Sequence, residues 1–104
     1  MTARTMFEKI WARHVIAEEE GELLLYVDRA LIHEGSSHAF AQLAARNQLV
    51  ARPRQVFAFT DHYVPTTGRD KGVDGIRNVE IRNMVVQLHA NAAKHGVTLF
   101  TKHA

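Results

Sequence analysis

The clearest candidate for chemistry in this sequence is an acid next to an imidazole, placed after an apolar run. Residues 56–59 read VFAF, and Thr60 leads directly to Asp61 and His62. A carboxylate beside a histidine can orient the ring and stabilise its charged form, which suits the ring to act as a general acid near neutral pH. The pair can also be structural, with the acid capping a loop amide and the histidine packing. The spacing alone leaves both interpretations open.

A second group of polar residues follows another apolar run, LLLYV at residues 23–27. The group consists of Asp28, Arg29, His33 and Glu34. Open parallel sheets bind their ligands beyond the carboxyl ends of the strands. If both runs are strands that point the same way, this group meets Asp61 and His62 at one edge of the sheet. The sequence therefore predicts a polar crevice at that edge.

Apolar residues at helical spacing predict helices near both ends of the chain. Thr5 and Glu8 form the pattern of a capping box at the start of the first helix, and Trp11 lies on its apolar face as an expected core residue. The last helix has the clearest pattern, with apolar residues on one face of 81–92 and Gly96 as the residue that ends it.

The remaining segments predict a second helix and a parallel sheet. Ser36 or Ser37 is expected to cap the second helix. The continuous apolar runs 23–27, 56–59 and 97–100 are typical of strands covered on both faces, as in a parallel sheet. Strands that alternate with helices predict a layered α/β fold with right-handed crossovers. Because three strands are few for such a sheet, the architecture is expected to be incomplete.

The composition excludes several classes of protein. The 104 residues, 46% hydrophobic and 23% charged, are enough for one small globular domain. A net charge of +2, with 13 basic and 11 acidic residues, is too even for a nucleic-acid-binding face. The chain has no cysteine and no paired-histidine motif, so no metal site is expected. Without a long apolar segment or a signal peptide, the sequence predicts a cytoplasmic protein that does not bind membranes.

Three blocks of the sequence stand out together. They are YVDRALIHEGSSHAF at 26–40, PRQVFAFTDHYVPT at 53–66 and NMVVQLHANAAKHGVTLF at 83–100. In order and spacing they resemble the amino-terminal part of the large subunits of isopropylmalate dehydratases, a family within the aconitase superfamily. The resemblance implies that residues 1–104 form the start of an aconitase-type domain, with no second domain. It also implies a three-layer α/β/α fold with a parallel-type sheet, here incomplete.

The resemblance also implies an activity. Members of this family interconvert 2-isopropylmalate and 3-isopropylmalate in leucine biosynthesis, by removing and re-adding water. It implies a small dicarboxylate substrate and a small subunit as partner in a heterodimer. The complete family members carry a [4Fe–4S] cluster, which no cysteine of this chain can ligate. The chain is therefore expected to be a fragment of a hydro-lyase that is inactive by itself.

The matched blocks assign roles to individual residues. Asp61 and His62 align with the acid–histidine pair that helps to protonate the departing hydroxyl, so both are predicted to be catalytic. His33 aligns with a substrate-binding position. The predicted substrate-binding residues are His33, Ser36, Ser37 and Asp28.

Several residues depart from the family pattern and leave the substrate open. They are Gly35, Ser36, His38 and Tyr63. One alternative is a related hydro-lyase that acts on citraconate, dimethylmaleate or homoaconitate. Another is a stand-alone binding module without catalysis.

Overall fold

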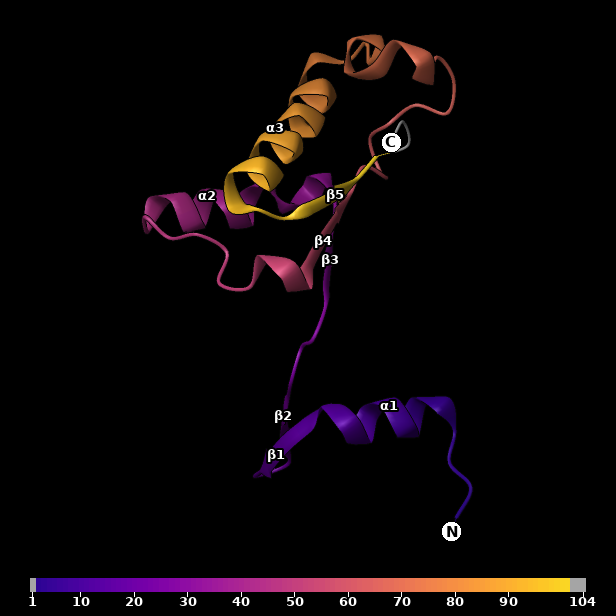
Figure 1. Cartoon of the computed structure of the whole chain (residues 1–104), viewed down its shortest axis with the longest axis vertical. Helices are drawn as coiled ribbons and strands as arrows, with labels where there is room; N and C mark the ends of the chain where they lie inside the picture. Colours follow the sequence, from indigo (N-terminus) through magenta and orange to yellow (C-terminus); the bar gives the residue numbers. More distant parts are fainter. Residues whose placement is uncertain (1, 102–104) are drawn as a thin grey trace.

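The computed structural model describes residues 2–101, which divide into two parts joined by an extended segment (Figure 1). The first part holds a helix and a β-hairpin, and the second holds a three-stranded sheet with helices. The Cα radius of gyration is 17.9 Å, whereas a compact chain of this length has a value of about 13 Å. The small first part therefore stands away from the second.

The first part begins with α1, Met6–His14. The predicted capping box is confirmed, because the Thr5 hydroxyl accepts the Glu8 N–H at 3.1 Å and the Glu8 carboxylate accepts the Thr5 N–H at 2.7 Å. The prediction that Trp11 belongs to a core is wrong: Trp11 is 38% exposed, and no residue of α1 is buried. Trp11 stacks on Phe7, and the two line a shallow apolar hollow together with Leu25, Tyr26 and Val27.

The predicted first strand, residues 23–27, belongs to a hairpin instead of the parallel sheet. β1, Val15–Glu19, pairs antiparallel with β2, Glu22–Leu25. Between them Glu20 and Gly21 both have positive φ, at 51° and 83°, as a two-residue type I′ hairpin turn requires. Because of this turn the backbone of β2 pairs with β1, and the leucines of β2 stay largely exposed.

The parallel sheet takes its first strand from a later segment. Its strands are β3, Ala30–Ile32, β4, Val56–Phe59, and β5, Thr98–Phe100, in that spatial order. Both pairings are parallel, with Ile32 opposite Ala58 and Ala58 opposite Leu99. The predictions of β4 and of the last strand are confirmed.

Two helices cover one face of this sheet (Figure 1). α2 spans Ser37–Ala45, and α3 spans Val79–His95 and ends at Gly96 in the left-handed conformation. The core lies between α3 and the sheet. It contains Ala58, Leu88, Ala92 and Val97, with Ile32, Val50, Val56 and Leu99 packed around them. None of the helices in residues 2–101 is long and apolar enough to cross a lipid bilayer.

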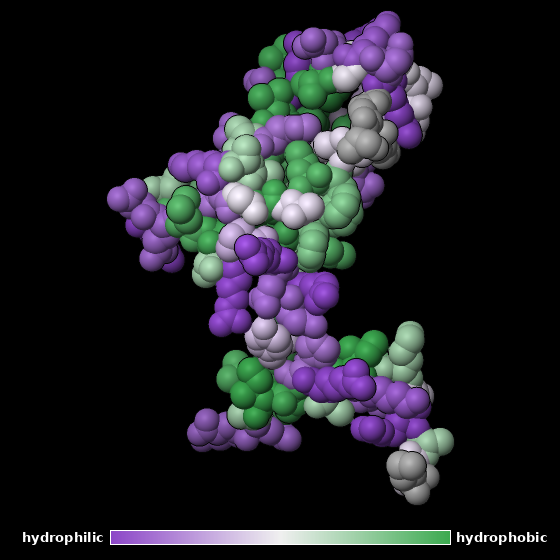
Figure 2. Space-filling view, viewed as in Figure 1, coloured by the Kyte–Doolittle hydropathy of each residue, from purple (hydrophilic) through white to green (hydrophobic). Residues whose placement is uncertain are grey.

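The opposite face of the sheet is open. Successive side chains of a strand point to opposite faces, so the residues that alternate with the core positions lie there. Phe100 stacks against Phe57 and Phe59, and Leu31 on the next strand is 72% exposed. Figure 2 shows apolar residues at the surface of both parts. The described residues thus form two layers of an α/β fold with a parallel sheet, which agrees with the incomplete architecture predicted.

Three short 3₁₀ segments complete the structure. They are η1, Glu34–Ser36, η2, Pro53–Gln55, and η3, Arg69–Gly75. η1 links β3 to α2, η2 precedes β4, and η3 lies in the long loop between β4 and α3.

A polar contact joins α1 to the segment between the two parts. His14 Nδ1–H donates to the Ile10 carbonyl at 2.6 Å, and His14 Nε2 lies 3.3 Å from Asp28 Oδ2. Both ring nitrogens are donors only when the ring is protonated. The Ile10 carbonyl first, and the Asp28 carboxylate second, therefore raise the pKa of His14. The hydrogen bond from His14 lowers the pKa of Asp28 in turn.

This contact should stabilise the first part most in mildly acidic solution. Because the pKa of His14 is raised, the contribution of His14 to stability is complete at pH values below the ordinary pKa of 6.5. It is lost as the pH rises through the raised pKa. Because the pKa of Asp28 is lowered, its contribution is complete above 3.8 and is lost as the pH falls through the lowered value. An NMR titration should give His14 a pKa above 6.5. Asp28→Asn should reduce this pKa only in part, since the Ile10 contact remains, and an unchanged pKa would contradict the contact.

The α3 core contact gives a stability prediction. Leu88 is 2% exposed, so Leu88→Ala should lower the free energy of unfolding by about 2–5 kcal/mol, through lost burial and the cavity left behind. Val86 lies on the same helix but is 47% exposed, so Val86→Ala should change the free energy of unfolding by no more than about 0.5 kcal/mol. Urea unfolding followed by circular dichroism measures both. Equal losses would show that α3 does not pack as described.

Candidate functional site

The ends of β3 and β4 bring His33 and Glu34 of the first predicted polar group close to Asp61 and His62 of the second. Ile32 pairs with Ala58 in parallel register, so the residues that follow both strands leave from the same edge of the sheet. His33 follows β3 directly, and Asp61 and His62 follow β4 after Thr60. Two strand ends meet at this edge as expected, but the first strand is 30–32, so the prediction that the end of 23–27 supplies the site is wrong.

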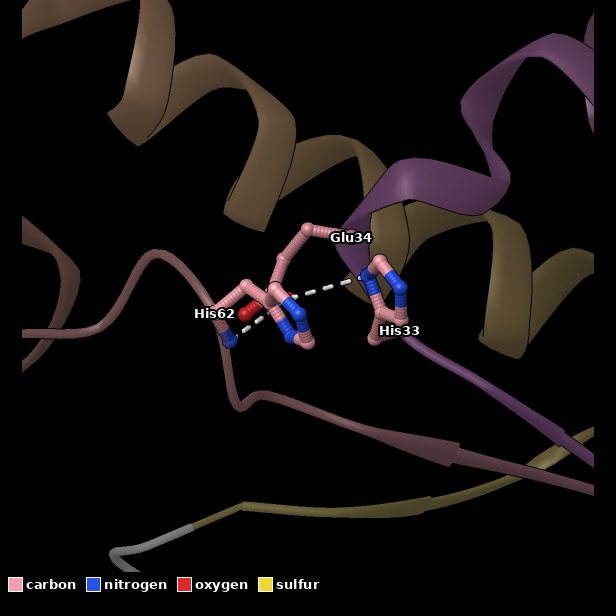
Figure 3. A group of neighbouring side chains, drawn as sticks. All are labelled: His33, Glu34 and His62. Atoms are coloured by element: carbon pink, nitrogen blue, oxygen red, sulfur yellow. Dashed lines mark hydrogen bonds and ion pairs between the residues drawn. The ribbon is translucent and has the colours of Figure 1, made fainter.

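His33 and His62 lie ring against ring at this edge (Figure 3). Their ring centroids are 4.1 Å apart, with 13° between the ring planes. The side chains are 43% and 57% exposed, so solutes can reach both rings. His62 Nδ1 lies 3.4 Å from Asp61 Oδ2, which leaves His62 Nε2 as the nitrogen available to a ligand.

The backbone of Gly35 orients the other ring. The Gly35 N–H donates to His33 Nδ1 at 3.0 Å. A nitrogen that accepts a hydrogen bond carries no proton, so the proton of the neutral ring is assigned to Nε2. A Cβ at position 35 would lie 2.8 Å from His33 Cε1. Glycine is therefore what allows the ring to lie over this peptide and to present an Nε2–H donor.

Glu34 is buried next to the two histidines; the sequence placed it in the polar group at this edge but assigned it no role. It is 1% exposed. Its Oε1 accepts the N–H of Asp61 at 2.8 Å, and its Oε2 accepts the N–H of His62 at 3.2 Å. No sequence pattern reveals these contacts, because they are made to backbone amides far along the chain, which almost any residue can supply.

The same three side chains are close enough together to be considered as metal ligands. Donor atoms of His33, Glu34 and His62 all lie within 4.8 Å of one another. However, both Glu34 oxygens and His33 Nδ1 already accept backbone N–H groups. A metal bound at His33 Nδ1 would have to replace the hydrogen bond from Gly35, so the geometry favours a hydrogen-bonding site. An iron–sulfur cluster does not fit these residues either, because clusters are held by cysteine thiolates and the chain has no cysteine.

The serines that follow Glu34 serve the local backbone. The Ser36 hydroxyl donates to the His33 carbonyl at 2.7 Å, and the Ser36 N–H donates to the same oxygen at 3.0 Å. Ser36 occupies the N-cap position of α2, but its side chain makes no capping hydrogen bond, so the predicted cap by Ser36 is wrong. Ser37 is the first residue of α2 and is half-buried.

Asp28 does not lie at the carboxyl end of a strand, as the sequence predicted. Because the run 23–27 belongs to the hairpin, Asp28 falls in the segment before β3. Its Oδ2 contacts His14 at 3.3 Å and Arg29 at 3.7 Å. The structure therefore separates Asp28 from the residues that it brings together at the end of the sheet.

Two hollows adjoin the histidine pair. A cavity of about 520 Å³ lies beside His33 and Asp61, with Phe59 and Phe100 on its apolar side. A groove of about 760 Å³ runs from His62 along the loop before α3, and its wall includes Lys71 and Arg77. Two cationic side chains and an imidazole in one groove suit a small anionic ligand.

Comparisons with known proteins agree with the fold and the blocks of sequence. The sequence profile of the aconitase family (aconitate hydratase) matches residues 8–104. The proteins named 3-isopropylmalate dehydratase large subunit from Listeria welshimeri and Listeria monocytogenes are each 43% identical to this chain over 98 residues. The match covers 92% of this chain but only 20% of each relative, so the chain spans about a fifth of their length. No solved structure matches the chain.

The packing of His33 over Gly35 gives a prediction for the site. In Gly35→Ala the new methyl group would collide with the His33 ring, which should turn away and lose its stack on His62. The ring is the mobile end of a half-exposed side chain, so thermal stability should change little. NMR should show nuclear Overhauser contacts between the two rings in the unaltered chain and their loss in the variant. Contacts that persist would show that glycine is not needed here.

Proposed function

Because the chain belongs to the aconitase family, we propose that it is part of a hydro-lyase that interconverts 2-isopropylmalate and 3-isopropylmalate, in leucine biosynthesis. The observation that carries the proposal is the contact of His33 with His62 beside Asp61 at one edge of the sheet. The names of the Listeria relatives support the choice of substrate. The chain spans only part of those relatives, so the activity is proposed for the complete protein.

In this proposal His62 moves the proton. Asp61 Oδ2, at 3.4 Å from Nδ1, orients the ring. The protonated Nε2 donates to the departing hydroxyl, which leaves as water, while the neighbouring carbon loses its proton to a second base of the complete enzyme. The neutral ring then accepts a proton from water when water is added in the reverse reaction. A positioned acid–base group of this kind contributes about 10²–10⁴-fold to the rate.

His33 binds the substrate in the proposal. Its Nε2–H can donate to a carboxylate or hydroxyl oxygen of the substrate, because the Gly35 N–H already occupies Nδ1. Lys71 and Arg77, in the groove beside His62, attract the second carboxylate. Ser36 and Asp28 are weaker candidates than the sequence indicated, since their polar atoms are engaged by the His33 carbonyl and by His14.

The proposal includes two components that lie beyond this chain. A small subunit is proposed as partner, because the relatives are named large subunits. An iron–sulfur cluster would have to be held by cysteines from outside these 104 residues, and no step above runs through it. The cytoplasmic location predicted from the sequence belongs to the same proposal.

The test is a hybrid enzyme. The matching segment of the Listeria monocytogenes large subunit is replaced by this chain, the hybrid is assembled with the small subunit of that organism, and dehydration of 3-isopropylmalate is followed by ultraviolet absorbance of the unsaturated acid. The hybrid should be active, and the 104-residue chain alone should not. Activity only on citraconate, dimethylmaleate or homoaconitate would favour a related hydro-lyase. A folded hybrid without activity on any of these acids would contradict the proposal.

Replacement of His62, the proposed proton donor, makes this assay specific for its role. His62→Ala in the hybrid should lower kcat by about 10²–10⁴-fold. His38→Ala is the matched control, because His38 is an exposed histidine on α2, and it should leave kcat unchanged. Equal activity of the two variants would exclude His62 as the proton donor.

A further inference from the structure

We infer that Glu34 is a positioning residue, whose buried carboxylate holds the backbone of Asp61 and His62 so that the acid–imidazole pair stays against His33. The inference rests on the proposed function, since it concerns how the proposed proton donor is kept in place. Glu34 touches neither of the two catalytic side chains of that pair in a hydrogen bond. Its two hydrogen bonds to the pair go to their peptide nitrogens instead.

Glu34 is fully buried, and two hydrogen bonds compensate its carboxylate for the loss of water. A carboxylate taken out of water is costly unless hydrogen bonds compensate it. Here the side chain has no exposed surface, and each oxygen accepts one backbone N–H, at 2.8 and 3.2 Å. Hydrogen bonds to an ionised acceptor are roughly twice as strong as neutral ones. No buried side-chain oxygen or nitrogen in residues 2–101 lacks a partner.

These hydrogen bonds begin where those of the sheet end. The register of β3 with β4 stops at Ile32 and Ala58, and the Thr60 N–H makes the last bond to β5, to the Phe100 carbonyl at 3.2 Å. The next two amides, those of Asp61 and His62, donate to the Glu34 carboxylate instead. Glu34 therefore continues the connection between the two strands beyond the sheet, at the point where the chain presents the pair to solvent.

Loss of the two hydrogen bonds from Glu34 would change the position of Asp61 and His62. Asp61 and His62 are both exposed, so few side-chain contacts hold them in place. Proton transfer requires hydrogen-bond reach of the substrate, and a misplacement of about 1 Å can lower the rate by about 10²-fold. Glu34 would thus affect the chemical step through the pair, while leaving the binding groups of His33 and the loop groove in place.

Two variants separate this role from a general role in stability. Glu34→Gln keeps the size of the side chain but replaces one acceptor oxygen by an NH₂ group, which cannot accept an N–H. The matched control is His95→Phe: His95 is buried on the far end of α3, and its Nδ1 accepts the Val50 N–H at 3.0 Å. Both variants lose one buried acceptor, and both should lower the melting temperature. Only Glu34→Gln should disturb the site.

The first readout is independent of activity. In NMR spectra of the 104-residue chain, the amide resonances of Asp61 and His62 should shift in Glu34→Gln, whereas those of Val85 and Leu88 in the core stay in place. His95→Phe should leave the amides of Asp61 and His62 unchanged. If Glu34→Gln leaves these two amides unchanged, the inference is wrong.

The second readout is the kinetics of the hybrid enzyme. Glu34→Gln should lower kcat by about 10²-fold with little change in KM, as expected for an interaction that matters in the transition state, and His95→Phe should leave kcat unchanged. Unchanged kcat, or a raised KM alone, would overturn the inference. If Glu34→Gln does not fold, Glu34→Asp decides: it keeps the charge but is one methylene shorter, so full activity would also overturn it. An inactive unaltered hybrid would refute the proposed function, and the amide shifts would still decide the role of Glu34.

Discussion

The parallel pairing of β3 with β4 is the constraint on which the site depends. It sends both chains out of the sheet at one edge, so His33 and His62, which are 29 positions apart in the sequence, meet ring against ring. The pairing ends before either histidine, and the Glu34 carboxylate continues it with two further hydrogen bonds. The core between α3 and β4, centred on Ala58, fixes the strand from which the pair extends.

The sequence predicted the parts of this arrangement that follow from local patterns. The run at 56–59 and the helical spacing of 81–92 each have one consistent interpretation, and the structure confirms β4 and α3. The run at 23–27 was assigned to the wrong sheet, because its apolar character is shared by a hairpin strand and a buried strand. The Glu20–Gly21 turn was the signal that distinguishes them. The role of Glu34 could not be predicted, since its partners are backbone amides.

The two parts of the chain differ in how well they are buried. The sheet and its two helices enclose a core on one face, while the apolar face of α1 and the aromatic face of the sheet remain exposed. Such faces are normally covered in a finished α/β domain. The chain matches about a fifth of its Listeria relatives. The geometry of His33, Glu34 and His62 does not depend on these open faces, because its hydrogen bonds come from the ends of β3 and β4 and from η1.

The most direct test of the account is a titration of the isotope-labelled 104-residue chain with 3-isopropylmalate, followed by NMR. The central claim is that the edge shared by the two strands binds a small dicarboxylate. The account predicts that the resonances of His33, His62 and Arg77 shift together and saturate, while those of His14 in the first part do not move. Shifts spread evenly over both parts, or none at His33 and His62, would contradict it.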